Sequence, residues 1–464
     1  MKVEALREGL ARVERHVPHG QRKLLETLIV DGDDGALFRV NPLAFAKVHG
    51  LDESEAIDLF LHATHAGLFH MAWHLLCPVC GDVVQCFGNL GHVAAHYHCD
   101  LCQADFDTAL DEYVEIAFTV SPQVRPISFH APTALPVEDF YFECEIHPGA
   151  VSAKGVRLRE WFREHTKMLT YLDPGGSHEI VAELSEGYLE GCDRINHSGF
   201  LFRVGGKAGK APAEGARVEL RLGPDGFSPR KGEIPSGLVS IVCENRAALR
   251  AALIAIHFPM DDLPSGPPTY APYLTGRRIA TSPTFRALYG ADMLRDDGGL
   301  AIKDVTIMFT DLSGSVALFE RLGDLNAYAL VREHYGAAAR LVTRFGGSIV
   351  KTIGDSIMIA FDDPRSALLT AFGLLEDIRR LGASRGIDGL GLRAGIHRGP
   401  AILVSLDGRL DFFGQAVNMA SRLQDLAGPG EMCLSAEVAA APSASELVPS
   451  HASRERAVLP GIPA

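Results

Sequence analysis

The chain has 464 residues, of which 47% are apolar and 22% are charged, and its formal net charge is −14. This length exceeds one ordinary domain, so we expect two to four domains with buried cores. The acidic balance argues against a protein that binds nucleic acid along its whole surface.

The start of the chain, MKVEALREGLARVERHVPHG, is charged and amphipathic and lacks the apolar core of a signal peptide. Since no stretch reaches about 18 uninterrupted apolar residues, we expect no membrane span. The nine cysteines include two CxxC pairs. Without an export signal, a cytoplasmic location and metal binding are better expectations than disulfides.

Residues 1–72 are predicted to form a helical, winged-helix-like unit. Asp52 is a suitable N-cap for the helix that starts ESEAIDLF, because Glu53 and Glu55 follow in its first turn. Units of this kind often bind DNA, but residues 22–76 contain four Lys or Arg against eight Asp or Glu. A DNA-reading face normally has a basic excess. We therefore expect packing or a protein contact here, and a DNA-binding regulator is the remaining alternative.

Residues 73–113 contain Cys77-x₂-Cys80, then eighteen residues, then Cys99-x₂-Cys102. Each CxxC pair can form a tight turn that places two thiolates on one ion, and two such pairs complete a tetrahedral site. The spacing is typical of a zinc ribbon. We predict one structural Zn²⁺ per chain on these four cysteines. A redox-active pair or plain buried thiols are the alternative.

Residues 114–262 alternate short apolar runs with Gly and Pro turns, as in VEIAFTV, FYFECEI, GFLFRV, RVELRL and GLVSIVC. This pattern predicts a β-rich, sandwich-like module, with one helix near VRLREWFREH. The segment shows no catalytic constellation, so we expect a regulatory module whose ligand or protein partner is unknown.

Residues 263–300 begin as a linker rich in Pro and Gly and continue into a short helix, SPTFRALYGADML, for which Ser282 is a suitable N-cap. Because this helix directly precedes the last domain, we expect it to transmit a signal.

Residues 301–464 alternate strands and helices. The strand VTIMFT precedes a helix from about residue 316 to 345, the hairpin SIVKTI/SIMIAF, a second helix and the strand LRAGIH. This βαββαβ order predicts a ferredoxin-like sheet with helices on one face. The whole chain is therefore expected to be a multidomain α+β protein.

Two carboxylates end strand-like runs of this last domain. Asp311 follows VTIMFT, and Asp355 lies at the turn of the hairpin. The strand and the hairpin can lie side by side, which would let both carboxylates share two Mg²⁺ or Mn²⁺ ions. An aspartate at a strand end is more often a turn or cap residue, but that alternative does not explain why both fit one βαββαβ frame. Backbone N–H groups at the start of a helix can bind phosphate, and we expect this of Leu312, Ser313, Gly314 and Ser315.

A second polar set offers partners for a nucleotide. Lys351 can donate to adenine N1 and Asp411 can accept from the 6-amino group, whereas guanine presents the reverse pattern at these edges. Asn418 and Arg422 are four residues apart and share one helical face. Asn418 can hold a ribose, and Arg422 can donate to a phosphate oxygen that gains charge in a transition state.

The segments FTDLSGS, VKTIGDS and DFFGQAVNMASR, within about residues 304–440, resemble the class III adenylate/guanylate cyclases. The resemblance implies the roles given above for the two aspartates, for the Lys–Asp pair and for the helical pair. It implies conversion of ATP into 3′,5′-cyclic AMP and pyrophosphate by attack of the ribose 3′-oxygen on the α-phosphate. Since the family's site is shared between two cyclase domains, the resemblance also implies a head-to-tail homodimer.

The layout of the whole chain resembles bacterial cyclases that carry a zinc-containing region of obscure function ahead of the catalytic domain. The CPVCG run, VEIAFTVSPQVR and FRALYGADML carry this second likeness.

The chain departs from the family in two places. The family often has Arg in the strand after GIHSG, where this chain has Pro400, and Arg398 or Arg393 could substitute. The family often has a phosphate-binding Lys near its end, whereas this sequence closes with VLPGIPA. Low activity is therefore one expectation, and a nucleotide sensor without turnover is an alternative function. A guanylate cyclase is disfavoured, because Glu and Cys or similar residues would be expected in place of Lys351 and Asp411.

Overall fold

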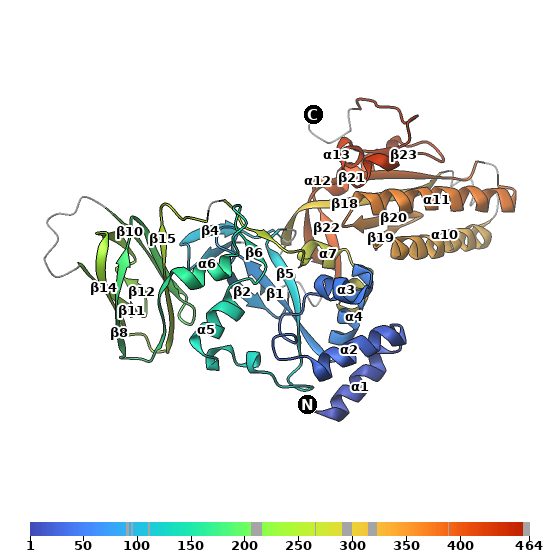
Figure 1. Ribbon diagram of the computed structural model, residues 1–464. Helices are drawn as coiled ribbons and strands as arrows, with labels where there is room; N and C mark the ends of the chain where they lie inside the picture. The colour runs from blue at the N-terminus through green and yellow to red at the C-terminus, as the bar shows by residue number, and fades with distance from the viewer. Residues whose placement is uncertain are drawn as a thin grey trace.

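The computed structural model describes residues 1–89, 92–93, 96–109, 112–205, 216–264, 266–289, 299–313, 323–387 and 389–457. A β-sandwich lies at one end and the C-terminal domain at the other, with the N-terminal helices and their sheet between them (Figure 1). The predictions made for Gly314 and Ser315 lie outside the described residues. Within the described residues, no helix is both long enough and apolar enough to cross a membrane.

Four helices lie in the segment predicted to be helical: α1 (Val3–Val13), α2 (His19–Asp31), α3 (Pro42–His49) and α4 (Glu53–His65). Asp52 is the N-cap of α4, as predicted, because its side chain accepts a hydrogen bond from the backbone N–H of Ser54. The helices pack on a four-stranded sheet of order β17-β5-β1-β2, made of β17 (Leu274–Thr275), β5 (Val114–Val120), β1 (Phe69–Leu76) and β2 (Val83–Phe87). We call α1–α4 and this sheet the N-terminal unit.

The two CxxC pairs lie at the edge of this sheet. The first follows β1, and the second brackets the turn of a two-stranded hairpin, β3 (His96–Cys99) and β4 (Ala104–Asp107). A further pair of short strands, β6 (Ala150–Val151) and β16 (Thr269–Tyr270), ties the expected linker back to the earlier chain. The linker is therefore packed along the N-terminal unit.

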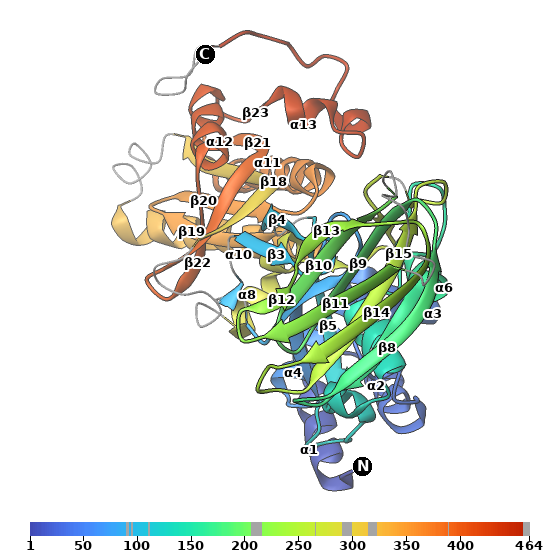
Figure 2. The same cartoon turned by 90° about the vertical axis from the view of Figure 1, so that its left-hand side faces the viewer.

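The predicted sandwich is formed by two sheets of orders β13-β10-β9-β15-β7 and β12-β11-β14-β8. Figure 2 looks onto the second sheet, with β11, β14 and β8 side by side. Side chains such as Leu189, Phe202, Leu220 and Ile241 fill the core between the sheets. The strands are β7 (Thr166–Leu172), β8 (Ser177–Leu184), β9 (Gly187–Asp193), β10 (Ser198–Val204), β11 (Ala216–Gly223), β12 (Gly226–Ser228), β13 (Lys231–Ile234), β14 (Gly237–Asn245) and β15 (Ala251–Pro259).

Two of the predicted strands of this module differ in the structure. The run VEIAFTV is a strand, but as β5 it pairs with β1 of the N-terminal unit. The run FYFECEI was predicted to be a strand, and this is wrong, because Phe140–Glu145 forms a π-helical turn, η4, directly after the short helix α5 (Val137–Asp139). A short run that is apolar throughout has no period that separates a strand from a buried helix. The predicted helix near VRLREWFREH is α6 (Leu158–His165).

The C-terminal domain has the predicted βαββαβ order: β18 (Gly299–Ser313), α10 (Asp324–Arg344), β19 (Ser348–Ile353), β20 (Ser356–Phe361), α11 (Pro364–Arg385) and β21 (Gly391–Leu406). The strand order β19-β20-β18-β21 is that of a ferredoxin-like sheet. The chain continues through β22 (Arg409–Phe413), α12 (Gln415–Leu426), β23 (Met432–Leu434) and α13 (Ala436–Ala440). Both β22 and β23 pair with β21.

The two faces of this sheet are covered differently. Met308, Ile357 and Ile359 face the helices α10 and α11 in one buried cluster, and Figure 1 shows these two helices side by side along the sheet. Ile307 and Met358 point to the other face, where they belong to the large cluster that also contains Ala420 of α12 and core residues of the N-terminal unit. The prediction of helices on one face is therefore correct for α10 and α11, while α12 and the N-terminal unit cover the opposite face.

A buried guanidinium joins three parts of the chain on the sandwich side. Arg194, between β9 and β10, lies 3.0 Å from a carboxylate oxygen of Asp82 and 2.7 Å from one of Glu145. It also donates to the backbone carbonyl of Val84 at 3.3 Å. Because Asp82 follows the first CxxC pair and Glu145 ends η4, this one side chain holds the cysteine site, η4 and the sandwich together.

We predict that Arg194→Met lowers the free energy of unfolding by about 3–5 kcal/mol, because it leaves the buried Asp82 carboxylate and the partly buried Glu145 carboxylate without a cation. Urea unfolding of the whole chain measures this change. The matched control is Arg217→Met, since Arg217 also pairs with a glutamate but has a side chain that is 52% exposed, and we expect about 1 kcal/mol or less from it. Equal effects of the two substitutions would contradict a structural role for the buried network.

Candidate functional site

Asp311 and Asp355, the candidate metal ligands that we call the metal aspartates, come from β18 and from the turn between β19 and β20. Thr310 of β18 pairs with Ile357 of β20, so the register places Asp311 beside Ser356, the residue after Asp355. The hydroxyl of Ser356 donates to Asp311 Oδ1 at 2.5 Å. Asp355 Oδ2 is buried and has no hydrogen-bond partner among the described residues. An uncompensated buried carboxylate oxygen next to a second carboxylate suits a bound cation.

A cation from this chain already lies on one metal aspartate. Arg393 stands directly opposite Asp311 in the pairing of β21 with β18, and its guanidinium forms an ion pair with the Asp311 carboxylate. Arg398, the other arginine that the sequence offers as a substitute phosphate ligand, instead binds Asp304 through two of its nitrogens. Of these two arginines, only Arg393 contacts the metal aspartates.

The expectation that Leu312 and Ser313 open a helix is wrong. Both residues continue β18 and pair with Leu392 and Gly391 of β21. Leu312 is only 1% exposed in the core under α10 and α11, and the Ser313 hydroxyl donates to Gly391 O at 2.9 Å. Because the Leu312 side chain is buried, β18 continues for two residues after Asp311. The sequence alone did not predict this extension of the strand.

Lys351 and Asp411, which we call the purine-reading pair, meet across the sheet. Lys351 lies on β19 and Asp411 on β22, at opposite edges in the strand order, yet Lys351 Nζ is 2.7 Å from Asp411 Oδ2. The sheet therefore curls until its edges approach. Asp411 is 5% exposed and its other oxygen accepts from the Phe412 N–H at 2.8 Å, so the carboxylate is held in one orientation. Phe413, 50% exposed, lies beside the Lys351 ammonium.

Asn418 and Arg422 lie on α12, as predicted, and both side chains are exposed. The guanidinium of Arg422 has a weak contact of 3.4 Å with Asp425 one turn further, so it is free to reach an incoming anion. The helix lies close against β21 because Gly395 has no side chain: a Cβ there would be 2.1 Å from the backbone nitrogen of Gln424. This contact fixes the height of the helix over the sheet.

The members of the purine-reading pair are attached to different parts of the sheet. On β21, the partner of Asp411 lies eleven residues after the partner of Asp311. Lys351 instead lies on the β19–β20 hairpin, four residues before Asp355. The contact of Lys351 with Asp411 therefore joins the part of the sheet that carries the metal aspartates to the far end of β21.

The four cysteines converge as the sequence predicts. Their sulfur atoms all lie within 4.8 Å of one another, with 3.5 Å between Cys77 and Cys102 and 3.7 Å between Cys80 and Cys99. A tetrahedral ion with four Zn–S bonds of about 2.3 Å needs sulfur atoms about 3.8 Å apart. The donor set and its spacing therefore fit Zn²⁺. Gly81, at φ +71°, makes the turn after the first pair.

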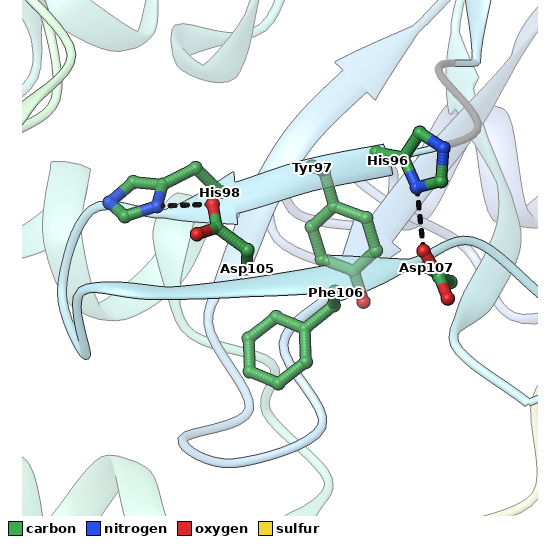
Figure 3. A pocket seen from close by; sticks show the side chains of 6 residues that line it. All are labelled: His96, Tyr97, His98, Asp105, Phe106 and Asp107. Atoms are coloured by element: carbon green, nitrogen blue, oxygen red, sulfur yellow. Dashed lines mark hydrogen bonds and ion pairs between the residues drawn. The ribbon is translucent and has the colours of Figure 1, made fainter.

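The histidines beside the cysteines take no part in this cluster. Figure 3 shows the β3–β4 hairpin, where His96 Nδ1 is 2.6 Å from Asp107 and His98 Nδ1 is 2.8 Å from Asp105. All four side chains are largely exposed. They line a shallow pocket with Tyr97 and Phe106 between them.

Two family models match this chain. Residues 10–287 match the family of unknown function DUF5939, which is more than half of the chain. Residues 300–456 match the catalytic domain of adenylate and guanylate cyclases. The sheet order and this match identify the C-terminal segment as a domain of the class III cyclase type.

Similar proteins match over the C-terminal segment. An adenylate cyclase of Glutamicibacter nicotianae is 31% identical over 146 residues, which cover 31% of this chain and 34% of that protein. Adenylate cyclase 2 of Rhizobium meliloti is 33% identical over 131 residues, covering 26% and 36%, and an adenylate cyclase of Anabaena cylindrica is 28% identical over 142 residues, covering 28% of each. The chain thus spans about a third of the length of these relatives.

Among solved structures, the adenylyl cyclase CyaB from P. aeruginosa is 24% identical with a TM-score of 0.28, covering 31% of this chain and 81% of that one. The guanylyl cyclase domain of the RhoGC fusion protein from Blastocladiella emersonii is 21% identical with a TM-score of 0.29, covering 30% and 85%.

Proposed function

The chain belongs to the DUF5939 family, whose function is unknown, and we propose that it is an adenylate cyclase that works as a homodimer and is regulated by its N-terminal region. One observation carries the proposal: a lysine and an aspartate that suit adenine lie 2.7 Å apart in the same domain as two neighbouring aspartates that suit divalent cations.

The metal aspartates are the residues proposed to hold two Mg²⁺ or Mn²⁺ ions. Asp355 has a buried carboxylate oxygen that finds no hydrogen-bond partner in the part of the chain that the structure describes, and Asp311 accepts a hydrogen bond from Ser356. Bound there, the ions would neutralise the triphosphate and lower the pKa of the ribose 3′-hydroxyl. Arg393 is placed to exchange its contact with Asp311 for one with a phosphate oxygen, so a substrate would satisfy the guanidinium while the carboxylate turns to a cation.

The purine-reading pair supports ATP over GTP. The Lys351 ammonium can only donate, which suits the unprotonated N1 of adenine. The Asp411 carboxylate can only accept, which suits the 6-amino group of adenine. Guanine has an N1–H donor and an O6 acceptor in these places, so each contact would be repulsive or unpaired.

The match to the cyclase catalytic domain supports a two-fold assembly. In the class III cyclases that this segment resembles, two cyclase domains share each site, so the metal aspartates of one chain would act with the purine-reading pair and the α12 residues Asn418 and Arg422 of another. A head-to-tail arrangement would create two equivalent sites.

We predict that the purified full chain converts ATP into cyclic AMP with Mn²⁺ or Mg²⁺, and that Asp311→Ala or Arg422→Ala each lowers the rate at least about a hundredfold, because each removes charge stabilisation of the transition state. Product identification by chromatography and mass spectrometry measures this. Tight ATP binding with no product from the unmodified chain would instead indicate a nucleotide sensor.

Mixing the two inactive variants tests the shared site. A mixed dimer contains one intact site, made of Asp355 and Asp311 from the Arg422→Ala chain and of α12 from the Asp311→Ala chain. We therefore expect the mixture to regain up to about a quarter of the unmodified rate when chains associate randomly. A mixture as inactive as its components would rule out a shared site.

We predict that the double substitution Lys351→Glu with Asp411→Cys reverses the preference from ATP to GTP, because it exchanges donors and acceptors at the base edge. The measured quantity is the ratio of kcat/KM for the two nucleotides. An unchanged ratio would show that another part of the chain selects the base.

The cysteine site is proposed to bind one structural Zn²⁺, since four thiolates leave no position for a substrate. Elemental analysis should give one zinc per chain. Cys99→Ser should lower both the zinc content and the melting temperature, whereas Cys86→Ser, an exposed thiol on β2, should change neither. A fully folded chain without zinc would contradict a structural role.

A further inference from the structure

The helix α8 (Pro283–Tyr289) lies between the N-terminal unit and the C-terminal sheet. Ser282 begins it as predicted, since its hydroxyl accepts from the Phe285 N–H at 3.2 Å. The DUF5939 match ends at residue 287 and the cyclase match begins at residue 300. The helix is therefore the last element of the N-terminal family region, and its contacts connect the two parts of the chain.

On one side, α8 is attached to the N-terminal unit. Tyr289 donates its hydroxyl to Leu61 O of α4 at 2.9 Å. Phe285 is fully buried and lies edge-on to Trp73 of β1, with ring centroids 6.1 Å apart. Thr284 hydrogen-bonds to Asp58 of α4, whose pKa is nevertheless raised by burial. A displacement of α4 or β1 would therefore carry α8 with it.

On its other side, the same segment contacts the strands of the purine-reading pair. Arg286 donates to the backbone carbonyl of Leu410, and its guanidinium lies 5.6 Å from the centre of the Phe412 ring. These two residues flank Asp411 in β22.

The other strand of the pair is contacted from the start of the helix. The Ser348 hydroxyl of β19 donates to Thr281 O at 2.6 Å, and Lys351 lies three residues further along β19. The turn before α8 and the helix itself therefore touch both edges of the curled sheet where those edges meet.

The contact of Arg286 with β22 depends on the positive charge of its guanidinium. Burial lowers the pKa of Arg286 to about 10, and the nearby Asp411 carboxylate opposes this shift. The side chain thus stays cationic near neutral pH, and it donates to the carbonyls of Leu410 and Ala280. A guanidinium held between two backbone carbonyls and an aromatic ring allows little freedom to the strand that it contacts.

We propose that Arg286 is a positioning residue for adenine recognition, which sets the backbone of β22 so that Asp411 meets Lys351 in the geometry that reads the base. Through α8, the placement of the N-terminal unit then controls how well the cyclase site accepts ATP. The inference rests on the function proposed above and adds to it the route by which the N-terminal region acts.

We expect a substitution of Arg286 to alter recognition of the base and to leave metal binding unchanged. Asp311 pairs with the start of β21 and Asp355 lies in the turn between β19 and β20, whereas Arg286 contacts β22. A shift of Asp411 by a fraction of an ångström weakens its hydrogen bond to the base. The affinity for ATP and the discrimination against GTP should therefore fall together, while turnover at saturating ATP changes little.

The test compares Arg286→Met with Arg286→Lys in the full-length chain. We expect Arg286→Met to raise the KM for ATP about tenfold and to lower the ATP/GTP ratio of kcat/KM by a similar factor. The kcat with saturating ATP and Mn²⁺ should stay within about twofold, and Arg286→Lys should restore part of the ratio because it keeps a cationic donor. Arg379→Met, which removes an arginine on the exposed face of α11, is the matched control and should change none of these values. A loss of kcat at unchanged KM would overturn the proposal.

A double-mutant cycle separates positioning from a general loss of structure. In the Asp411→Ala background, Arg286→Met should produce no further change in the ATP/GTP ratio, because the side chain through which it acts is gone. Additive changes in the two backgrounds would overturn the proposal.

Equilibrium binding of non-hydrolysable ATP and GTP analogues, measured by calorimetry, keeps the inference distinct from the proposed function. If the unmodified chain makes no cyclic AMP, the proposed cyclase activity fails, and the binding ratio still reports whether Arg286 sets base preference.

If Arg286→Met does not fold, Tyr289→Phe tests the same route, since it removes the hydrogen bond of α8 to α4 without touching the sheet. It should shift the binding ratio in the same direction by a smaller factor, and an unchanged ratio would overturn the route.

Discussion

The antiparallel pairing of β18 with β21 sets the positions of Asp311 and Asp411, two of the candidate site residues of the C-terminal domain. The ladder runs from Gly299 opposite Val404 to Ser313 opposite Gly391. At one end the ladder places Asp311 beside Arg393. At its other end β21 also pairs with β22, and this second pairing sets the position of Asp411. Because side chains alternate along a strand, a slip of one residue would turn Asp311 and Asp411 away from their partners.

The N-terminal region is held together by buried charges as well as by its apolar core. Glu115 of β5 lies 2.5 Å from Arg39 and 3.3 Å from His147, and all three side chains are buried. These pairs join the helices, the sheet and the segment after η4, just as Arg194 joins the cysteine site to the sandwich. Buried ion pairs add little net stability, but breaking one costs several kcal/mol, so they specify a single arrangement of the parts they join. A region that keeps one arrangement is able to transmit its displacement to α8.

The local signals of the sequence predicted much of the site. The two CxxC pairs, the hairpin turn at Gly354 and Asp355, and the four-residue spacing of Asn418 and Arg422 all depend on neighbours in the chain, and the structure has each of them in the expected element. The errors concern segments whose conformation depends on distant partners. FYFECEI is helical because its apolar side chains are buried on several sides, and Leu312 stays in a strand because the core under α10 and α11 holds it.

The sequence by itself determined which chemical groups are present, and the spacing of the motifs determined the elements that carry them. Only the tertiary structure decided which of those groups meet. It brings Lys351 to Asp411 by curling the sheet, attaches Arg393 to Asp311 through strand pairing, and places Arg286 against the carbonyl before Asp411. These partners are 60, 82 and 124 residues apart in the chain. Contacts of such separation follow from how the whole chain buries its apolar surface, which no local pattern records.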